Sequence, residues 1–460
     1  MLKYEKKEKE FKIVKITDKL INKYKIKTVG EKDIEFFIYK KGLYSKDKRL
    51  LQKEIEEEYQ DECTTHKVKE IINKISRKTY IPREDFDKID PNIICVKNGA
   101  LNLSTLELKE HNADYNFTTQ IPITYNKEKK CPLFFKFLEE TLDKQYIILI
   151  QEFMGMCLFR QYYPKKAFIF VGETNTGKTT LISILEKFIS SEEDREKNIS
   201  GLNLQKIATD KFSTINLYKK YVNIHDDMSE KDISDTGNFK MLTGAGTFDG
   251  EYKFGDHFKF KNYAKLLFAC NTIPAVKEIG DDNAYFERWV IIPFENIIQK
   301  KILLREEKII NNQNEMSGIL NWALEGFKRV IENSQYSYNK TNKEIKETMI
   351  KYNKKNSIAN FAIDNLIEKT GEWIKKEELY KHYQNYASKN ELPIETKKKF
   401  GTNFRKYANY VAEIRKEGDD VWGNVVVISD IKEEDYNEED YNEEIDVIEE
   451  ALKNKTLFTN

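Results

Sequence analysis

A loop between a predicted strand and a predicted helix constrains this chain more than any other feature. Residues 170–185, FVGETNTGKTTLISIL, pass from an apolar run through a glycine-containing loop into an apolar pattern with helical spacing. Residues 172–179 fit G-x-x-x-x-G-K-[ST], and a strand before it and a helix after it are the context in which this pattern forms a P-loop. The alternative is a turn with a chance lysine, which does not account for both flanking elements.

The chemistry of such a loop follows from its backbone. Successive N–H groups and the positive N-terminus of the following helix face phosphate oxygens. We expect Lys178 to neutralise the β and γ phosphates of ATP, and Thr179 to offer its hydroxyl to Mg²⁺, which prefers oxygen ligands. The expected nucleotide-binding residues are Gly172, Glu173, Thr174, Asn175, Thr176, Gly177, Lys178, Thr179 and Thr180.

Two acids follow a second apolar segment, YVNIHDD, at residues 221–227. A buried strand there places both carboxylates at the rim where phosphates lie. Asp226 is the expected metal ligand together with Thr179, and Asp227 is the expected base for the attacking water. The alternative is an exposed turn that happens to carry two aspartates.

A third apolar segment, KLLFACNTIP, ends in Asn271, which we expect beside Asp227 on the neighbouring strand. An amide at that position can orient the water or contact the γ phosphate. The alternative is an asparagine that only turns the chain before Pro274. Arg288 precedes a further apolar strand, a position at which arginine is commonplace.

The charge of the chain is unevenly distributed. Lys and Arg balance Asp and Glu at 77 each, but residues 431–450 hold eleven acids and one lysine, and residues 1–430 carry a net charge of +8. The low apolar content of 431–460 predicts an acidic, disordered tail. This tail either solubilises the protein or competes with DNA for a basic surface.

Neither a second metal site nor a disulfide framework is indicated. The five cysteines form no C-x-x-C pair, Cys63 and His66 have no matching second pair, and Asp85 and Asp87 fit a solvated loop better than a metal site. No stretch reaches the length of a membrane span, and the first residues lack the apolar core of a signal peptide. We therefore expect no membrane partner and a cytoplasmic location, the host cytoplasm for a viral protein.

The segments before the P-loop predict two regions. Residues 1–78 combine charged runs with apolar residues at helical spacing, which predicts a helical N-terminal region. Residues 79–164 predict a lead-in of helices and a β-hairpin, with the hairpin turn at Asn98-Gly99 because both residues tolerate positive φ. Helical patterns return over 131–159.

Beyond a helical linker at 299–350, residues 351–430 predict a winged-helix domain. Three helical patterns, at 357–369, 376–390 and 395–411, precede a two-strand wing at 412–428. The third helix carries cations that we expect to contact DNA phosphates, while Phe400 and Phe404 pack inward. These cations are Lys397, Lys398, Lys399, Arg405 and Lys406. The alternative is a solvated, lysine-rich helix face.

The order of these segments resembles one group of proteins. The blocks that carry the resemblance are VKNGALNLSTLELKEHN, FIFVGETNTGKTTL, YVNIHDD, FKMLTGAGTFDGEYKFGDHFKFKNYAKLLFACNTIP and ERWVIIPFEN. In this order they resemble the superfamily 3 helicases, an AAA+-like group of small viruses, phages and plasmids. Within it, the chain is most similar to the phage and plasmid primase-helicase family that includes the poxvirus type. The resemblance covers about residues 80–430.

The resemblance implies a role for several residues. Asp226 and Asp227 look like the Walker B acids. Asn271 looks like the sensor asparagine, and Arg288 looks like the finger that completes a neighbouring subunit's site. Only one arginine stands before WVIIPF where relatives often have two, so Arg288 is the sole local choice.

The resemblance also implies a DNA-gripping hairpin before the sensor strand, in the central pore of a hexamer. Lys253 is the implied phosphate contact, with Phe254 and His257 as alternatives, and a solvated surface hairpin is the other reading. Many relatives carry an acid close behind the TG pair, whereas this chain delays it to Asp249, which leaves the register of the hairpin open.

These features together predict an α/β protein. Its P-loop AAA+-like parallel-sheet ATPase core, at 165–298, lies between a helical N-terminal region and a C-terminal winged-helix domain. We expect an ATP-dependent DNA helicase with ATP and Mg²⁺ as cofactors, single-stranded DNA in the pore of a homo-hexamer, and duplex DNA at the winged helix.

Partners and alternatives follow from the same features. Fewer than 172 residues precede the P-loop, so we expect a separate primase or polymerase to supply any priming. One alternative is a nucleotide-switched initiator that remodels origin DNA without processive unwinding. Another is a packaging ATPase, which shares the engine but does not explain the hairpin and the winged helix.

Overall fold

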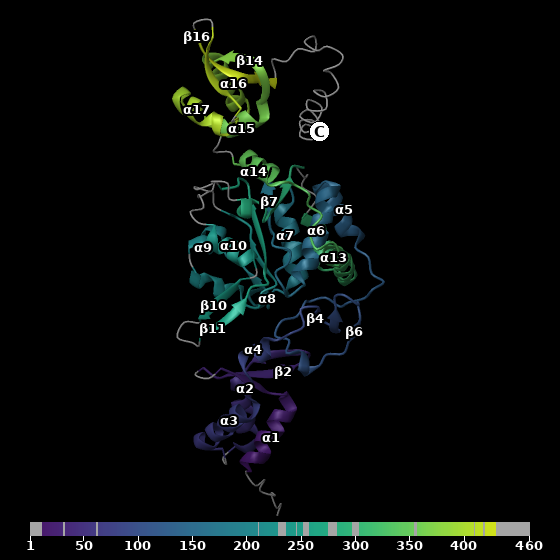
Figure 1. Ribbon diagram of the computed structural model, residues 1–460. Coiled ribbons are helices and arrows are strands. Elements are labelled where there is room, and N and C mark those ends of the chain that lie inside the picture. Colours follow the sequence, from purple (N-terminus) through teal and green to yellow (C-terminus); the bar gives the residue numbers. More distant parts are fainter. Residues whose placement is uncertain are drawn as a thin grey trace, which may run out of the picture. The chain divides into compact units, whose positions relative to one another are not determined.

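The computed structural model describes twelve stretches of the chain: residues 12–30, 33–60, 63–209, 211–228, 236–244, 246–251, 257–274, 283–296, 303–353, 357–408, 410–416 and 419–428. It divides into two compact units, residues 1–346 and residues 347–460. Each unit is described by itself below (Figure 1). The finer domain borders expected from the sequence stay predictions.

The first unit begins with a small α/β region that differs from the helical region expected at 1–78. Its elements are α1 (Ile13–Tyr24), β1 (Lys27–Val29), β2 (Glu35–Lys40), β3 (Leu43–Lys46), α2 (Lys48–Tyr59), α3 (Thr65–Thr79) and α4 (Arg83–Asp87). The strands form an antiparallel sheet in the order β1-β2-β3. In β2, Phe36 and Ile38 pack against α1, α2 and α3, while Phe37 packs on the other face against Phe86. This period of two explains why the segment forms a strand.

The expected β-hairpin is present, but its turn lies one residue earlier. The elements here are β4 (Ile93–Val96), β5 (Gly99–Asn102), β6 (Leu108–Lys109) and η2 (Ala113–Tyr115). Val96 pairs with Gly99, so Lys97 and Asn98 form the loop. Gly99 lies in the strand, where a Cβ atom would stand 2.3 Å from the carbonyl oxygen of Lys109. Glycine is needed there for the close approach of β6 rather than for the turn.

A five-stranded sheet forms the centre of the first unit, and its strands are parallel, as the sequence predicts. Its strands are β7 (Ala167–Gly172), β8 (Ile199–Ser200), β9 (Val222–His225), β12 (Lys265–Cys270) and β13 (Trp289–Phe294). The spatial order is β13-β7-β12-β9-β8, and every neighbouring pair is parallel. All carboxyl ends therefore meet at one edge of the sheet and all amino ends at the other.

Helices and a hairpin surround this sheet. They are α5 (Pro132–Thr141), α6 (Lys144–Cys157), α7 (Lys178–Ile189), α8 (Arg195–Asn198), α9 (Leu204–Thr209), η3 (Lys211–Leu217), α10 (Gly237–Thr243), β10 (Thr247–Glu251), β11 (His257–Lys261), α11 (Asn283–Phe286), α12 (Leu303–Ile310) and α13 (Gln313–Asn333). The next helix, α14 (Asn342–Lys351), contains the border between the two units. Figure 1 shows α6, α7 and α13 to one side of β7 and α10 to the other.

The strands of the sheet bury both faces. Phe168 and Phe170 of β7 belong to the large core with α6, α7 and α13. On the opposite face, Trp289 stacks on Phe239 of α10 with ring centroids 4.6 Å apart and contacts Phe268 at 5.9 Å. Burial on both faces explains the nearly continuous apolar runs of these strands.

The second unit packs helices on an antiparallel sheet. Its elements are α15 (Ser357–Asn365), β14 (Leu366–Lys375), α16 (Lys376–Lys389), α17 (Lys397–Asn403), η4 (Phe404–Lys406), β15 (Ala412–Lys416) and β16 (Asp419–Val427). The sheet order is β14-β16-β15. The helix expected over 357–369 ends at Asn365, because Leu366 starts a strand that pairs with Val427. The two expected wing strands are present as β15 and β16, which pair antiparallel.

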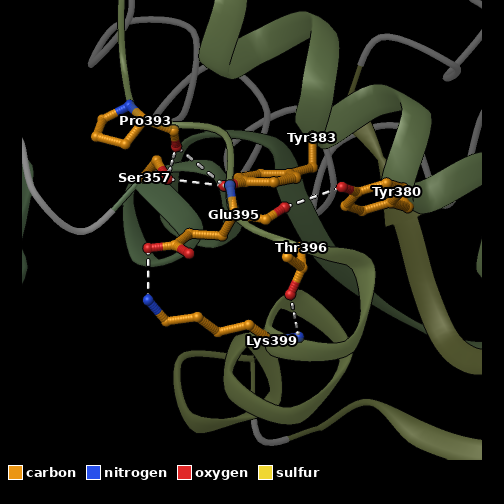
Figure 2. Close-up of polar contacts among 7 residues, drawn as sticks. All are labelled: Ser357, Tyr380, Tyr383, Pro393, Glu395, Thr396 and Lys399. Carbon is orange, nitrogen blue, oxygen red and sulfur yellow. Dashed lines mark hydrogen bonds and ion pairs between the residues drawn. The ribbon is translucent and has the colours of Figure 1, made fainter.

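A network of polar contacts fixes the start of α17 (Figure 2). The Tyr383 hydroxyl lies 2.8 Å from Ser357 Oγ and accepts a hydrogen bond from the Glu395 N–H at 2.8 Å. Tyr380 donates to the Glu395 carbonyl at 2.9 Å, and Thr396 Oγ1 accepts from the Lys399 N–H at 3.4 Å. The N-terminal cap of α17 is therefore tied to the core of its own unit.

Candidate functional site

The loop 172–178 connects the carboxyl end of β7 to the first residue of α7. Asn175 and Gly177 have positive φ angles of 64° and 91°, which bend the backbone on itself between strand and helix. A Cβ atom on Gly172 would stand 2.2 Å from the carbonyl oxygen of Phe294, so only glycine fits beside β13. Residues 173–175 of the loop are exposed. The backbone turn and its exposure suit a phosphate-binding loop.

Lys178 is buried inside this loop, with 9% of its surface exposed. Its Nζ donates to the carbonyl oxygens of Gly172 and Glu173 at 2.6 Å each and lies 3.4 Å from Thr176 Oγ1. Burial lowers the pKa of Lys178, and the nearby Cys270 and Glu173 act in the opposite direction. Because its acceptors belong to the loop itself, the ammonium can exchange them for phosphate oxygens without leaving its position.

The two aspartates lie at the same edge of the sheet. Asp226 and Asp227 follow β9 directly, and both are exposed. The Met228 N–H donates to the carbonyl oxygen of Ala269 at 2.9 Å, so the aspartates run alongside the end of β12. The sheet thus brings the carboxylates to the edge at which the loop 172–178 begins.

Asn271 follows β12, the strand that lies between β7 and β9 in the sheet. The last residue of β12, Cys270, pairs with Val171 of β7. Asn271 is exposed, as is Thr179 in the first turn of α7, while Thr180 is partly buried. The predicted groups on β7, β9 and β12 therefore gather at one edge, whose exposed oxygens are the donor type that suits a divalent cation.

Arg288 is not part of this group. It precedes β13, and its carbonyl accepts a hydrogen bond from the Ala167 N–H at 2.7 Å, which places it at the amino edge of the sheet. Its guanidinium donates to the Ala284 carbonyl and lies 3.4 Å from Glu287. The sheet separates Arg288 from the loop 172–178 of its own chain.

One further neighbour of the site, Arg195, lies in a segment that shows no motif. Arg195 of α8 donates to Glu186 of α7 through Nε at 3.3 Å and Nη2 at 2.5 Å. The pKa of Arg195 is raised, first by this hydrogen bond and also by the carboxylate charge of Asp226. Arg195 thus adds positive charge near the predicted metal ligand, from a charged segment with no motif.

The structure describes the side chains of some of the residues predicted to contact DNA, but not of all. Lys253 and Phe254 lie outside the described residues, and the side chain of His257 at the start of β11 is not described either. In the second unit, Lys397 pairs with Glu377, Lys399 with Glu395 at 2.5 Å, and Arg405 with Glu413 at 3.8 Å. Lys398 is exposed without an ion pair among the described residues, and the side chain of Lys406 is not described.

Of the pair Asp85 and Asp87, the second has contacts within the protein. Asp87 accepts from the Tyr218 hydroxyl and pairs with Lys219, so protein groups already occupy it. Within the described ranges, no group of three or more His, Cys, Asp or Glu residues is placed to hold a metal ion. No helix in the described part of the chain is both long and apolar enough to span a bilayer.

Family comparisons match two segments. Residues 2–143 match the family described as D5 N terminal like, and residues 170–288 match a family of unknown function, DUF5906. No curated protein matches the chain. The first match supports a relationship to viral and phage primase-helicases, a group that acts in DNA replication.

Solved structures with a similar backbone trace include two titled as apo structures of the NrS-1 C terminal region. Both are 14% identical in sequence and have a TM-score of 0.43. One covers 89% of this chain and 98% of its own, and the other covers 91% and 100%. A third, titled like the first as an A form apo structure of this region, is also 14% identical and has a TM-score of 0.44. Similarity at this level carries no argument about the site.

Proposed function

We propose that the chain is an ATP-dependent DNA helicase that hydrolyses ATP at the carboxyl edge of its parallel sheet. One observation carries the proposal: the ends of β7, β9 and β12 bring a buried, loop-bound lysine, two exposed aspartates and an exposed asparagine to that edge. Ligands of open α/β sheets bind at the carboxyl ends of the strands.

Each residue at this edge has a proposed task. Lys178 gives up its loop carbonyls and donates to the β and γ phosphates, and the N–H groups of 173–178 bind the remaining phosphate oxygens. Asp227 accepts a proton from the attacking water, and Asn271 orients that water.

Thr179 and Asp226 would hold Mg²⁺. Two protein oxygens suffice, because Mg²⁺ keeps several waters and takes further ligands from the phosphates. When bound, the ion neutralises charge that develops on the phosphate oxygens.

The position of Arg288 supports a ring. Its own phosphate loop lies at the opposite edge of the sheet, so any phosphate that this arginine contacts belongs to a neighbouring subunit. The side chain is 13% exposed and would have to leave the Ala284 carbonyl to reach that phosphate. We propose a homo-hexamer in which Arg288 stabilises the charge on the phosphate transferred next door. The β10–β11 hairpin contacts single-stranded DNA, and the second unit acts as a winged helix on duplex DNA.

The two aspartates provide the test. Asp227→Asn should leave ATP binding nearly unchanged and lower hydrolysis at least 100-fold, because the water is no longer polarised. Asp226→Asn should weaken Mg²⁺-dependent ATP binding as well. The matched control is Asp33→Asn. Asp33 is an exposed aspartate that precedes β2 and belongs to no helix or strand.

The readouts are binding of a fluorescent ATP analogue and phosphate release by the full-length protein. If both aspartate variants hydrolyse ATP at the wild-type rate, the carboxyl edge is not the catalytic site. Loss of ATP binding in Asp227→Asn alone would reverse the assignment of the two carboxylates.

A further inference from the structure

A hollow lies at the amino edge of the sheet, opposite the loop 172–178. It is a cavity of about 570 Å³ whose walls come from residues 160–165, which precede β7, and from residues 261–263, which are the last residue of β11 and the two residues after it. Ile89 and Pro91 of the lead-in region complete it. Since β7 and β12 are parallel, the cavity opens at their amino ends, away from the loop 172–178. Its volume suits a ligand of nucleotide size.

The charge of this cavity is one-sided. Arg160, Lys165 and Lys261 line it, and the ten lining residues, all in the described part of the chain, include no Asp or Glu. Lys165 and Lys261 are exposed and have no ion pair with any described residue. The two ammonium groups are therefore available to an anion, and no acid in the wall opposes its approach.

Arg160 adds a fixed charge behind the wall. Its Nη2 donates to the Tyr221 hydroxyl at 2.8 Å, and its guanidinium lies 5.3 Å from the centre of the Phe117 ring. Its Nε and Nη1 are buried and have no hydrogen-bond partner among the described residues. A buried cation without a carboxylate is unfavourable, and contact with aromatic faces offsets only part of that. An anion in the cavity would offset more of it through space.

Aromatic rings stand beside these cations. Tyr162, Tyr163 and Tyr263 line the cavity. Tyr163 is 36% exposed, and its hydroxyl donates to the Ser334 carbonyl at 2.6 Å, which holds the ring at the surface. Tyr162 is held by a hydrogen bond to the Lys166 carbonyl at 2.9 Å. A fixed, partly exposed tyrosine ring is a surface on which a nucleobase stacks.

One buried side chain ties the two walls together. Lys265 Nζ donates to the carbonyls of Phe159 and Gln161 in one wall, at 2.5 and 2.7 Å, and to that of Tyr263 in the other, at 3.0 Å. Lys265 thus bridges the two walls, and the strands that follow them, β7 and β12, are paired as well. The cavity is a built feature of the fold rather than a gap between two loose loops.

We propose that this cavity is a second phosphate site that binds a nucleotide, with Lys165 and Lys261 on its phosphate and a tyrosine ring against its base. The nucleotide is either free or one unit of a single strand, and both offer the same phosphate and base. The inference does not depend on ATP hydrolysis at the other edge of the sheet.

The test uses two probes with the full-length protein: thymidine 5′-monophosphate for a free nucleotide, and a 20-nucleotide oligothymidylate for a strand. Lys165→Ala/Lys261→Ala should weaken binding of at least one probe about tenfold, since charge-assisted contacts to its phosphate are lost. The control Lys97→Ala/Lys127→Ala removes two other exposed lysines and should change affinity less than twofold. All four replaced side chains are exposed, so thermal unfolding should stay at wild-type temperature.

The two probes separate the sources. Monophosphate binding that depends on Lys165 and Lys261 and persists in Lys178→Ala indicates a free-nucleotide site. If only binding of the oligothymidylate depends on Lys165 and Lys261, the cavity binds one unit of a single strand. Photocrosslinks from 4-thiothymidine should then map to Tyr163 or Tyr263. Equal affinity of wild type and Lys165→Ala/Lys261→Ala for both probes would overturn the proposal.

Discussion

Two buried lysines at opposite edges of one sheet have nearly the same local chemistry and different surroundings. Lys178 donates to two carbonyls and a threonine hydroxyl at the carboxyl edge, and Lys265 donates to three carbonyls at the amino edge. Burial lowers the pKa of both. Neither the hydrogen bonds nor the direction of the pKa shift therefore distinguishes Lys178 from Lys265.

The difference lies in what can reach each ammonium group. The acceptors of Lys178 belong to an exposed loop at a helix N-terminus, so a phosphate can replace them. Lys265 is 2% exposed, and its acceptors belong to two different wall segments that it holds together. We therefore propose that Lys178 is a binding group, whereas Lys265 is a structural tie.

The largest expected difference between the two lysines is in ATP hydrolysis. Lys178→Ala should lower hydrolysis below detection, because the cation on the transferred phosphate is lost. Lys265→Met should keep hydrolysis within about threefold of wild type, since no phosphate reaches it. Phosphate release by folded, purified variants measures both. Loss of activity in a folded Lys265→Met protein would break the distinction.

The next effect concerns the arginine at the amino edge. Arg288→Ala should still bind ATP but hydrolyse it about 10³-fold more slowly, as is typical for loss of an arginine finger. Glu287→Gln, which removes only the neighbouring carboxylate, is the matched control.

Mixing Arg288→Ala with Lys178→Ala should restore part of the activity, because mixed rings contain interfaces with an intact loop and an intact arginine. If the two variants co-assemble and no activity returns at any ratio, Arg288 does not act on a neighbour.

A smaller effect is expected in stability against pH. Burial lowers the pKa of Lys265 from 10.5 to about 7. Between these values the unfolded chain binds this proton more strongly than the folded chain, so the free energy of unfolding rises with pH. The rise is at most about 1.4 kcal/mol per pH unit, because only one proton distinguishes the folded from the unfolded chain.

Urea unfolding of wild type and Lys265→Met at pH 7.5 and 9.5 measures this contribution. Wild type should gain stability relative to the variant as the pH rises. Equal changes in both proteins would mean that Lys265 stays charged across this range.

The smallest effect separates the cations of the second unit. Lys398 has no ion pair among the described residues, whereas Lys397 pairs with Glu377. Lys398→Ala should lower the salt dependence of duplex binding by about 0.9 in the log–log slope, as expected for one lost phosphate contact. Lys397→Ala should lower it less, because that lysine must first leave Glu377. Identical slopes for both variants and wild type would place this helix away from DNA.

Much of the core could be predicted from sequence because local patterns agree there. One type of secondary structure fits the sequence pattern in each of four segments: the strand before Gly172, the helix from Lys178 and the apolar runs before Asp226 and Asn271. Parallel pairing then brings the ends of the strands to one edge of the sheet. The roles of these residues in catalysis stay predictions.

The rest depends on contacts that pattern does not encode. Phe36 to Ile38 form a strand because two separate cores receive alternate side chains, and Leu366 leaves the helical pattern because it pairs with Val427. Arg195 reaches the surroundings of Asp226 only through its bond to Glu186. The cavity at the amino edge joins segments about 100 residues apart in sequence.

Strand displacement on a forked DNA duplex is the most direct test of the central claim that ATP hydrolysis at the carboxyl edge drives unwinding. The full-length protein with ATP and Mg²⁺ should release the displaced strand over many turnovers, and Lys178→Ala should release none while still binding the fork. Binding and local melting without strand release by the wild-type protein would contradict a helicase, and would instead fit an initiator that remodels DNA without processive unwinding.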